Sequence, residues 1–110
     1  ISSNTGEVNN SAKTGAANLV PIAYGNVTAL GNINTGTGNF TISNTATGAY
    51  LITVAGEVLD VSNCIIQVTT QNSNPRFIGY GSSGGSLYVY IRDNTSAFVN
   101  NNFSFIIYRP

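Results

Sequence analysis

The feature that most constrains this chain is its alternation of short β-prone segments with stretches of asparagine, glycine and serine. The connecting stretches at 44–48, 71–75 and 82–85 have the length and residue types of hairpin loops. The segments rich in β-branched and aromatic residues lie at 21–27, 38–43, 49–54, 64–70, 76–80, 86–92 and 103–109. Seven or eight antiparallel strands at this spacing predict an all-β fold, an antiparallel β-sandwich or jelly roll.

Apolar side chains are distributed unevenly along the 110 residues, a length typical of one domain. Residues 1–18 contain only two sizeable apolar side chains, Ile1 and Val8, too few to offset the entropy lost on folding. Residues 19–110 contain 34 Val, Ile, Leu, Phe and Tyr residues. We therefore expect a polar linker or extended arm at 1–18 and a β-sandwich head domain at 19–110.

The charge content excludes several classes of function. The chain has four basic and four acidic residues, so no basic surface can form that would bind nucleic acid through its phosphates. The longest apolar run, at 87–91, is far shorter than the roughly 20 residues that a membrane-spanning helix needs, so we expect no membrane insertion. With no histidine and one cysteine, Cys64, we expect no metal site and no cofactor, and Cys64 is expected in the core.

Catalytic groups are equally scarce. Without histidine, the common nucleophilic triads cannot form. A glycosidase needs two carboxylates on opposite sides of a sugar. The chain offers Glu7, Glu57, Asp60 and Asp93, of which Glu57 and Asp60 share one short connection. We read these as solvated loop acids and expect no enzyme activity, with a catalytic pair assembled between subunits as the weaker alternative.

The distribution of apolar residues within the strands indicates a partner. Segment 38–43 alternates apolar and polar residues, as a strand with one wet face does. Segments 86–92 and 103–109 carry apolar or aromatic residues on both faces. Because a two-layer sandwich covers only one face of each sheet, the second face needs another surface, and the simplest is another copy of the chain.

Several motifs resemble the C-terminal domains of bacteriophage tail fibres and bacterial surface proteins. These motifs are IAYGNV at 22–27, GTGNFTI at 36–42, TGAYLITV at 47–54 and the ending FSFIIY at 103–108. Such domains are similar to the trimeric jelly rolls of complement globular heads and tumour necrosis factor. The resemblance covers about residues 20–110 and implies a homotrimer on an extracellular or virion surface. We expect Tyr88, Tyr90, Phe105 and Tyr108 at the trimer interface.

A surface rich in amides, hydroxyls and aromatic rings suits a carbohydrate or another polar ligand. Asn100, Asn101, Asn102, Arg92 and Tyr80 are the candidate ligand-binding residues. Replacing the three asparagines is expected to weaken binding without lowering stability. The predicted function is a non-catalytic receptor-binding or adhesion module at the tip of a fibre or surface protein, with a host-surface glycan or protein as its partner. The alternatives are that the tyrosines pack between subunits, or that the module only trimerises or decorates a virion and has no ligand.

Overall fold

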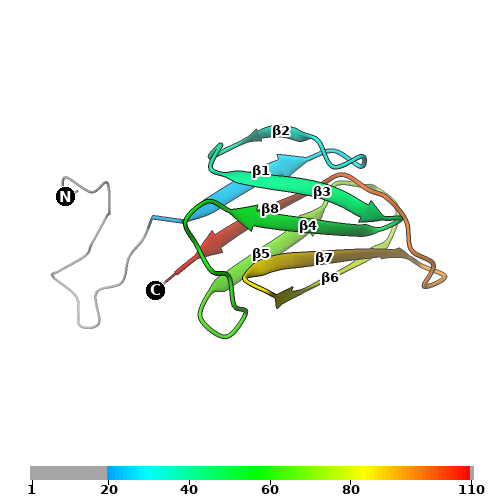
Figure 1. The fold of residues 1–110 in the computed structure, drawn as a ribbon. Coiled ribbons are helices and arrows are strands. Elements are labelled where there is room, and N and C mark those ends of the chain that lie inside the picture. Colours follow the sequence, from blue (N-terminus) through cyan, green and yellow to red (C-terminus); the bar gives the residue numbers. More distant parts are fainter. Residues whose placement is uncertain (1–19, 110) are drawn as a thin grey trace, which may run out of the picture.

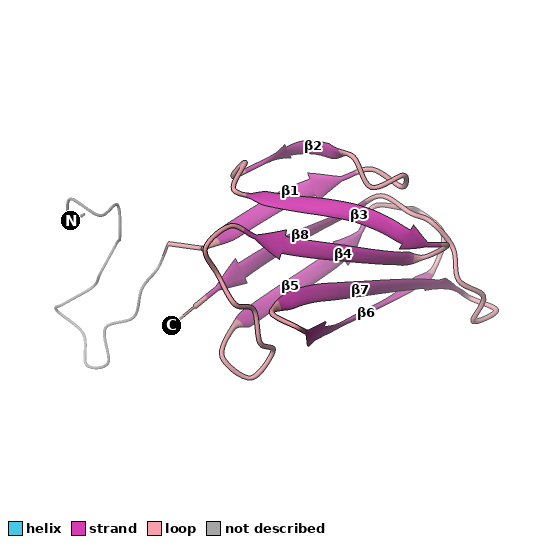
Figure 2. Cartoon of the chain, in the orientation of Figure 1, coloured by secondary structure: helices cyan, strands magenta, loops and turns pink. Residues whose placement is uncertain are grey.

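The computed structural model describes residues 20–109, which form two antiparallel four-stranded sheets stacked face to face (Figures 1 and 2). The first sheet has the strand order β2-β1-β8-β5, with β1 at Ala23–Val27, β2 at Ile33–Gly36, β5 at Ile65–Thr70 and β8 at Phe103–Tyr108. The second has the order β3-β4-β7-β6, with β3 at Phe40–Ala46, β4 at Ala49–Val54, β6 at Arg76–Ser83 and β7 at Ser86–Asp93. The predicted all-β sandwich is therefore confirmed. The arm predicted at 1–18 lies outside the described residues.

The core lies between the sheets and is filled by alternate residues of the strands. Phe40 meets Phe105 edge to face, with ring centroids 4.9 Å apart, and Tyr50 meets Phe103 at the same distance. Cys64 is buried, as predicted. The remaining core side chains are Ala23, Val27, Ile52, Val54, Leu59, Ile66, Leu87, Val89, Ile91 and Ile107. Packing of the two inner faces against each other is what holds the layers together.

The two strands with apolar residues on both faces belong to different sheets. β8 lies between β1 and β5, whereas β7 lies between β4 and β6. In β8 the residues Phe103, Phe105 and Ile107 are buried, and Ser104, Ile106 and Tyr108 alternate with them on the outer face. The outer faces of β7 and β8 therefore point to opposite sides of the sandwich.

One end of the sandwich carries both ends of the described chain, and the other end carries four loops. Ala23 at the start of β1 pairs with Ile107 near the end of β8, so the described chain enters and leaves at one end (Figure 1). The opposite end, called the far end below, carries the loops at 28–32, 47–48, 71–75 and 94–102. No helix occurs in residues 20–109, and so none that could cross a membrane.

Candidate functional site

Asparagine side chains join the loops of the far end. Asn100 Oδ1 accepts hydrogen bonds from the backbone N–H of Gly48, at 2.7 Å, and from Asn44 Nδ2, at 3.2 Å. Asn102 Oδ1 accepts one from the N–H of Ala29, at 2.7 Å. These bonds attach the β3–β4 turn and the β1–β2 loop to the segment that leads into β8.

Asn101 lies at the centre of this arrangement and is only 5% exposed. Its Nδ2 donates to the carbonyls of Asn102, at 2.7 Å, and Gln71, at 3.3 Å, and its Oδ1 accepts from Asn72 Nδ2 at 2.7 Å. Its backbone N–H donates to the Tyr50 hydroxyl at 3.1 Å. The side chain therefore satisfies buried polar groups of the protein itself.

The Tyr50 hydroxyl links the same loops from inside the sandwich. It donates to the carbonyl of Ala29 at 2.7 Å, in addition to accepting from Asn101. Burial raises the pKa of Tyr50, against a smaller lowering effect of the Asn101 hydrogen bond. The phenol is thus kept protonated, as its role as donor to Ala29 requires.

These contacts correct the prediction for the three asparagines. The amide oxygens of Asn100, Asn101 and Asn102 bind groups of neighbouring loops, and Asn101 is enclosed by the protein. Unsatisfied buried polar groups are costly, so replacing the buried Asn101 is expected to lower stability. The asparagines therefore join the far-end loops, and the burial of Asn101 contradicts the expectation that it can be replaced without loss of stability, whereas ligand binding by the three residues stays a prediction.

Aromatic rings on the outer face of the second sheet form the second candidate surface, called the aromatic row below: Tyr88, Tyr90 and Phe98, with Arg92. The Tyr88 and Tyr90 rings are nearly parallel, 10° between planes, with centroids 6.4 Å apart. Phe98 lies 6.4 Å from Tyr90, and the Arg92 guanidinium lies 3.9 Å from the centre of the Phe98 ring. Tyr90 is 42% and Phe98 45% exposed. The row leads along β7 toward the far end.

The strand pattern explains why these rings are uncovered. Leu87, Val89 and Ile91 of β7 fill the core, so Tyr88, Tyr90 and Arg92 face outward. On the edge strand β6, the residues paired with Tyr90 and Tyr88 are Gly79 and Gly81. A Cβ added at either glycine would have no atom within 4 Å, so no side chain covers the rings from that side.

The turn after β7 positions Arg92 and Phe98. Asp93 Oδ1 accepts hydrogen bonds from Thr95 N, at 2.8 Å, Thr95 Oγ1, at 2.6 Å, and Ala97 N, at 3.1 Å. The Thr95 hydroxyl contributes most to lowering the pKa of Asp93. Arg92 Nη1 donates to the carbonyl of Ser96 at 3.1 Å, and Arg92 and Phe98 form an isolated β-bridge. The guanidinium is therefore fixed from both the turn and the ring.

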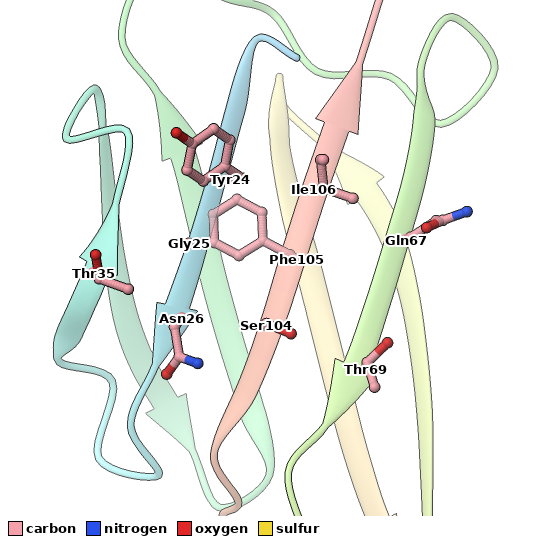
Figure 3. Close-up of a pocket in the computed structure, with 9 residues that line it drawn as sticks. All are labelled: Tyr24, Gly25, Asn26, Thr35, Gln67, Thr69, Ser104, Phe105 and Ile106. Carbon is pink, nitrogen blue, oxygen red and sulfur yellow. The ribbon is translucent and has the colours of Figure 1, made fainter. Parts of the chain in front are cut away.

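A groove of about 410 Å³ crosses the outer face of the first sheet and is the third candidate surface (Figure 3). Asn26, Ser104 and Thr69 form a polar row across β1, β8 and β5, with Tyr24 and Ile106 beside it. The face continues toward the end of β8 with Tyr108 and its paired residue Ile65, which is 55% exposed. None of the four strands of this sheet contains a charged residue.

The structure separates the residues predicted to form sites. Tyr80 pairs with Val89, so it lies on the opposite side of the second sheet from Arg92 and the aromatic row. Tyr88 and Tyr90 lie on the outer face of the second sheet, and Tyr108 on that of the first. Phe105 is 3% exposed in the core, which corrects its assignment to an interface between subunits.

Phe98 belongs to the aromatic row but was not among the residues predicted from the sequence. It is the single large apolar side chain in the polar stretch 93–98, and a lone exposed aromatic residue in a polar loop is a usable signal for a contact surface. Phe77, which pairs with Arg92 and is exposed, extends the aromatic row onto β6 and was likewise missed.

The carboxylates of residues 20–109 are bonded to other groups of the protein. Glu57 forms an ion pair with Arg109 at 2.9 Å, and Asp60 bonds to the backbone and hydroxyl of Ser62, which lowers the pKa of Asp60. No group of three or more potential metal ligands occurs in this part of the chain.

Comparison of the chain with protein-family models, with curated proteins and with solved structures found no match.

Proposed function

We propose that the protein is a non-catalytic receptor-binding or adhesion module that holds a saccharide of a host surface on the aromatic row. The observation that carries the proposal is the set of mutually oriented rings formed by the half-buried Tyr88 and the exposed Tyr90 and Phe98. Aromatic side chains offer a large apolar face, and tyrosine adds a hydroxyl at its rim. Sugars present both apolar C–H faces and hydroxyl groups, so such a surface matches their chemistry.

Rigidity of the surface supports the same proposal. The rings of Tyr88 and Tyr90 stand on β7, an inner strand of its sheet, and Phe98 is fixed by its bridge to Arg92. The asparagine and Tyr50 contacts described above join the far-end loops to one another. Binding to a pre-formed surface costs little additional ordering, which matters for a ligand that offers few contacts.

We further propose that the module acts as a homotrimer, assembled through the outer face of the first sheet. This face combines Tyr24, Ile65, Ile106 and Tyr108 with uncharged polar groups. In a symmetric assembly a surface meets copies of itself, so unpaired charges would face one another at a cost. A trimer would present three weak saccharide sites together and so raise avidity.

The resemblance of the motifs at 22–54 and 103–108 to phage tail-fibre and bacterial surface domains supports a location on an extracellular or virion surface. The uncharged face of the first sheet also favours the alternative function, a structural trimerisation or virion-decoration module with no ligand of its own.

A glycan array probed with the protein tests the proposal. We expect saccharide binding that Tyr90→Ala weakens about fivefold or more, since stacking contacts are worth about 1 kcal/mol per ring. Tyr80→Ala is the matched control, because Tyr80 is 45% exposed yet lies on the other side of the sheet. An array with no bound saccharide, for a protein that still trimerises, would favour the structural alternative.

A further inference from the structure

Arg92 places a positive charge at the end of the aromatic row, on a surface that is otherwise uncharged on β6 and β7. Arg92 is exposed and faces outward, whereas the other outward residues near it on β6 and β7 are Phe77, Gly79, Tyr88 and Tyr90. We propose that the saccharide held on the aromatic row carries a carboxylate, which Arg92 binds. This inference rests on the proposed function and specifies its ligand class.

No carboxylate of residues 20–109 neutralises Arg92. The ion pair in that part of the chain joins Arg109 and Glu57. Asp93 follows Arg92 directly, but its carboxylate is bonded within its own turn and lies near Arg76, which contributes to lowering the pKa of Asp93. Asp93 also pairs with Arg76 in the sheet register, so the two face the side of the sheet opposite to Arg92. The positive charge of Arg92 is therefore available to a ligand.

The guanidinium is also oriented in advance. Its Nη1 donates to Ser96 and its carbon lies 3.9 Å from the centre of the Phe98 ring. A guanidinium has five N–H donors in a planar fork that matches the two oxygens of a carboxylate. Because the Ser96 hydrogen bond occupies Nη1, donors on the other nitrogens can meet a carboxylate without a change of rotamer.

The position of this charge distinguishes a carboxylated sugar from a neutral one. Arg92 stacks on Phe98, and Phe98 packs beside Tyr90, so the cation and the stacking surface are adjacent. A sugar ring on Tyr90 would place a substituent within reach of Arg92. Charge-assisted hydrogen bonds are roughly twice as strong as neutral ones, so a carboxylate at that position is favoured over a hydroxymethyl group.

Matched pairs of ligands test the inference. Binding of trigalacturonate and of sialyllactose is measured by titration calorimetry against their methyl esters, which keep the sugar rings and remove the charge. At least one acid is expected to bind about tenfold or more tightly than its ester. In Arg92→Gln the ratio of acid to ester affinity should fall to about twofold or less, and Arg92→Lys should restore part of that ratio. Tyr90→Ala should weaken acid and ester alike.

Arg109→Gln is the control, because Arg109 is ion-paired with Glu57 and directly follows β8, at the end of the sandwich opposite to the far end. It should keep the preference for the acid. Equal binding of acids and esters to the wild-type protein, or a preference that survives in Arg92→Gln, would overturn the inference while leaving saccharide binding intact. Absence of binding to any saccharide would overturn the proposed function, and this inference with it. Thermal melting of Arg92→Gln shows whether the variant is folded.

Discussion

Individual asparagines do in this protein what regular backbone pairing does elsewhere. At the far end the strands stop, and the N–H groups of Ala29 and Gly48 have no backbone partner on a neighbouring strand. They donate instead to the side-chain oxygens of Asn102 and Asn100. An asparagine amide has a donor and an acceptor in the same geometry as a peptide group, so it can replace a missing strand neighbour. The high asparagine content of the chain is thus partly a structural requirement of its loops.

Asn101→Ala is the substitution that tests this role. It would leave the carbonyl of Gln71 and the amide of Asn72 without their partner, at a cost of about 1–3 kcal/mol in the free energy of unfolding. Urea unfolding followed by tyrosine fluorescence measures the change. Asn94→Ala, at an exposed position of the same loop, should change stability by about 0.5 kcal/mol or less. Equal midpoints for the two variants would contradict the assigned role.

Residue type alone could not separate these roles. A run of asparagines between two strands is compatible both with a solvated ligand loop and with a bonded cluster, because the difference depends on partners such as Tyr50 and Gln71, distant in sequence. The predicted ligand residue Arg92 does lie in the aromatic row, since the alternation of 86–92 determines its face. Phe98 joins it only through the turn geometry, which sequence pattern does not express.

Strands were predictable where their side chains are buried on one face. The segments at 49–54 and 86–92 match β4 and β7 closely. In both strands an apolar residue stands at every second position and is buried in the core. β2 was missed because its four residues are exposed and only one is apolar. The assignment of strands to sheets could not be read from local pattern, since β8 pairs with β1, which is distant in sequence, and so lies in the sheet opposite to β7.

The turn that follows β7 makes the stability of the fold depend on pH. Hydrogen bonds from Thr95 and Ala97 hold the pKa of Asp93 below its ordinary value of 3.8. The folded state therefore binds this proton less readily than the unfolded state, so the stabilisation is present above the ordinary value and is lost as the pH falls through the lowered one. Asn can accept the same hydrogen bonds without titrating.

Asp93→Asn should therefore show a shallower loss of unfolding free energy than the wild type when the pH is lowered from about 5 to about 2. Thermal or urea unfolding across this range measures the slope. Asp60→Asn, in which a second turn aspartate is changed, provides a comparison for the size of the effect, because Ser62 lowers the pKa of Asp60. Parallel curves for wild type and Asp93→Asn would show that the turn does not distinguish the two protonation states.

At the scale of the whole molecule, the two outer faces of the sandwich have different chemistry. The second sheet presents stacked rings and a positive charge, whereas the first presents aliphatic and aromatic groups beside uncharged polar ones. An assembly through the first sheet leaves the aromatic row of every copy accessible. The two faces can therefore serve assembly and ligand binding at the same time without competing for residues.

Ile65→Asp and Tyr90→Asp separate these faces in one experiment. Ile65 is paired with Tyr108 on the first sheet, and a carboxylate there would lose its hydration and face its own copies in a trimer. Light scattering at micromolar concentration should show a trimer for the wild type, a monomer for Ile65→Asp and a trimer for Tyr90→Asp, whose change lies on the second sheet. Both side chains are exposed in the protomer, so neither change removes core packing.

A monomeric wild type would contradict the trimer. Dissociation by Tyr90→Asp alone would place the interface on the aromatic row and leave no free surface for a saccharide.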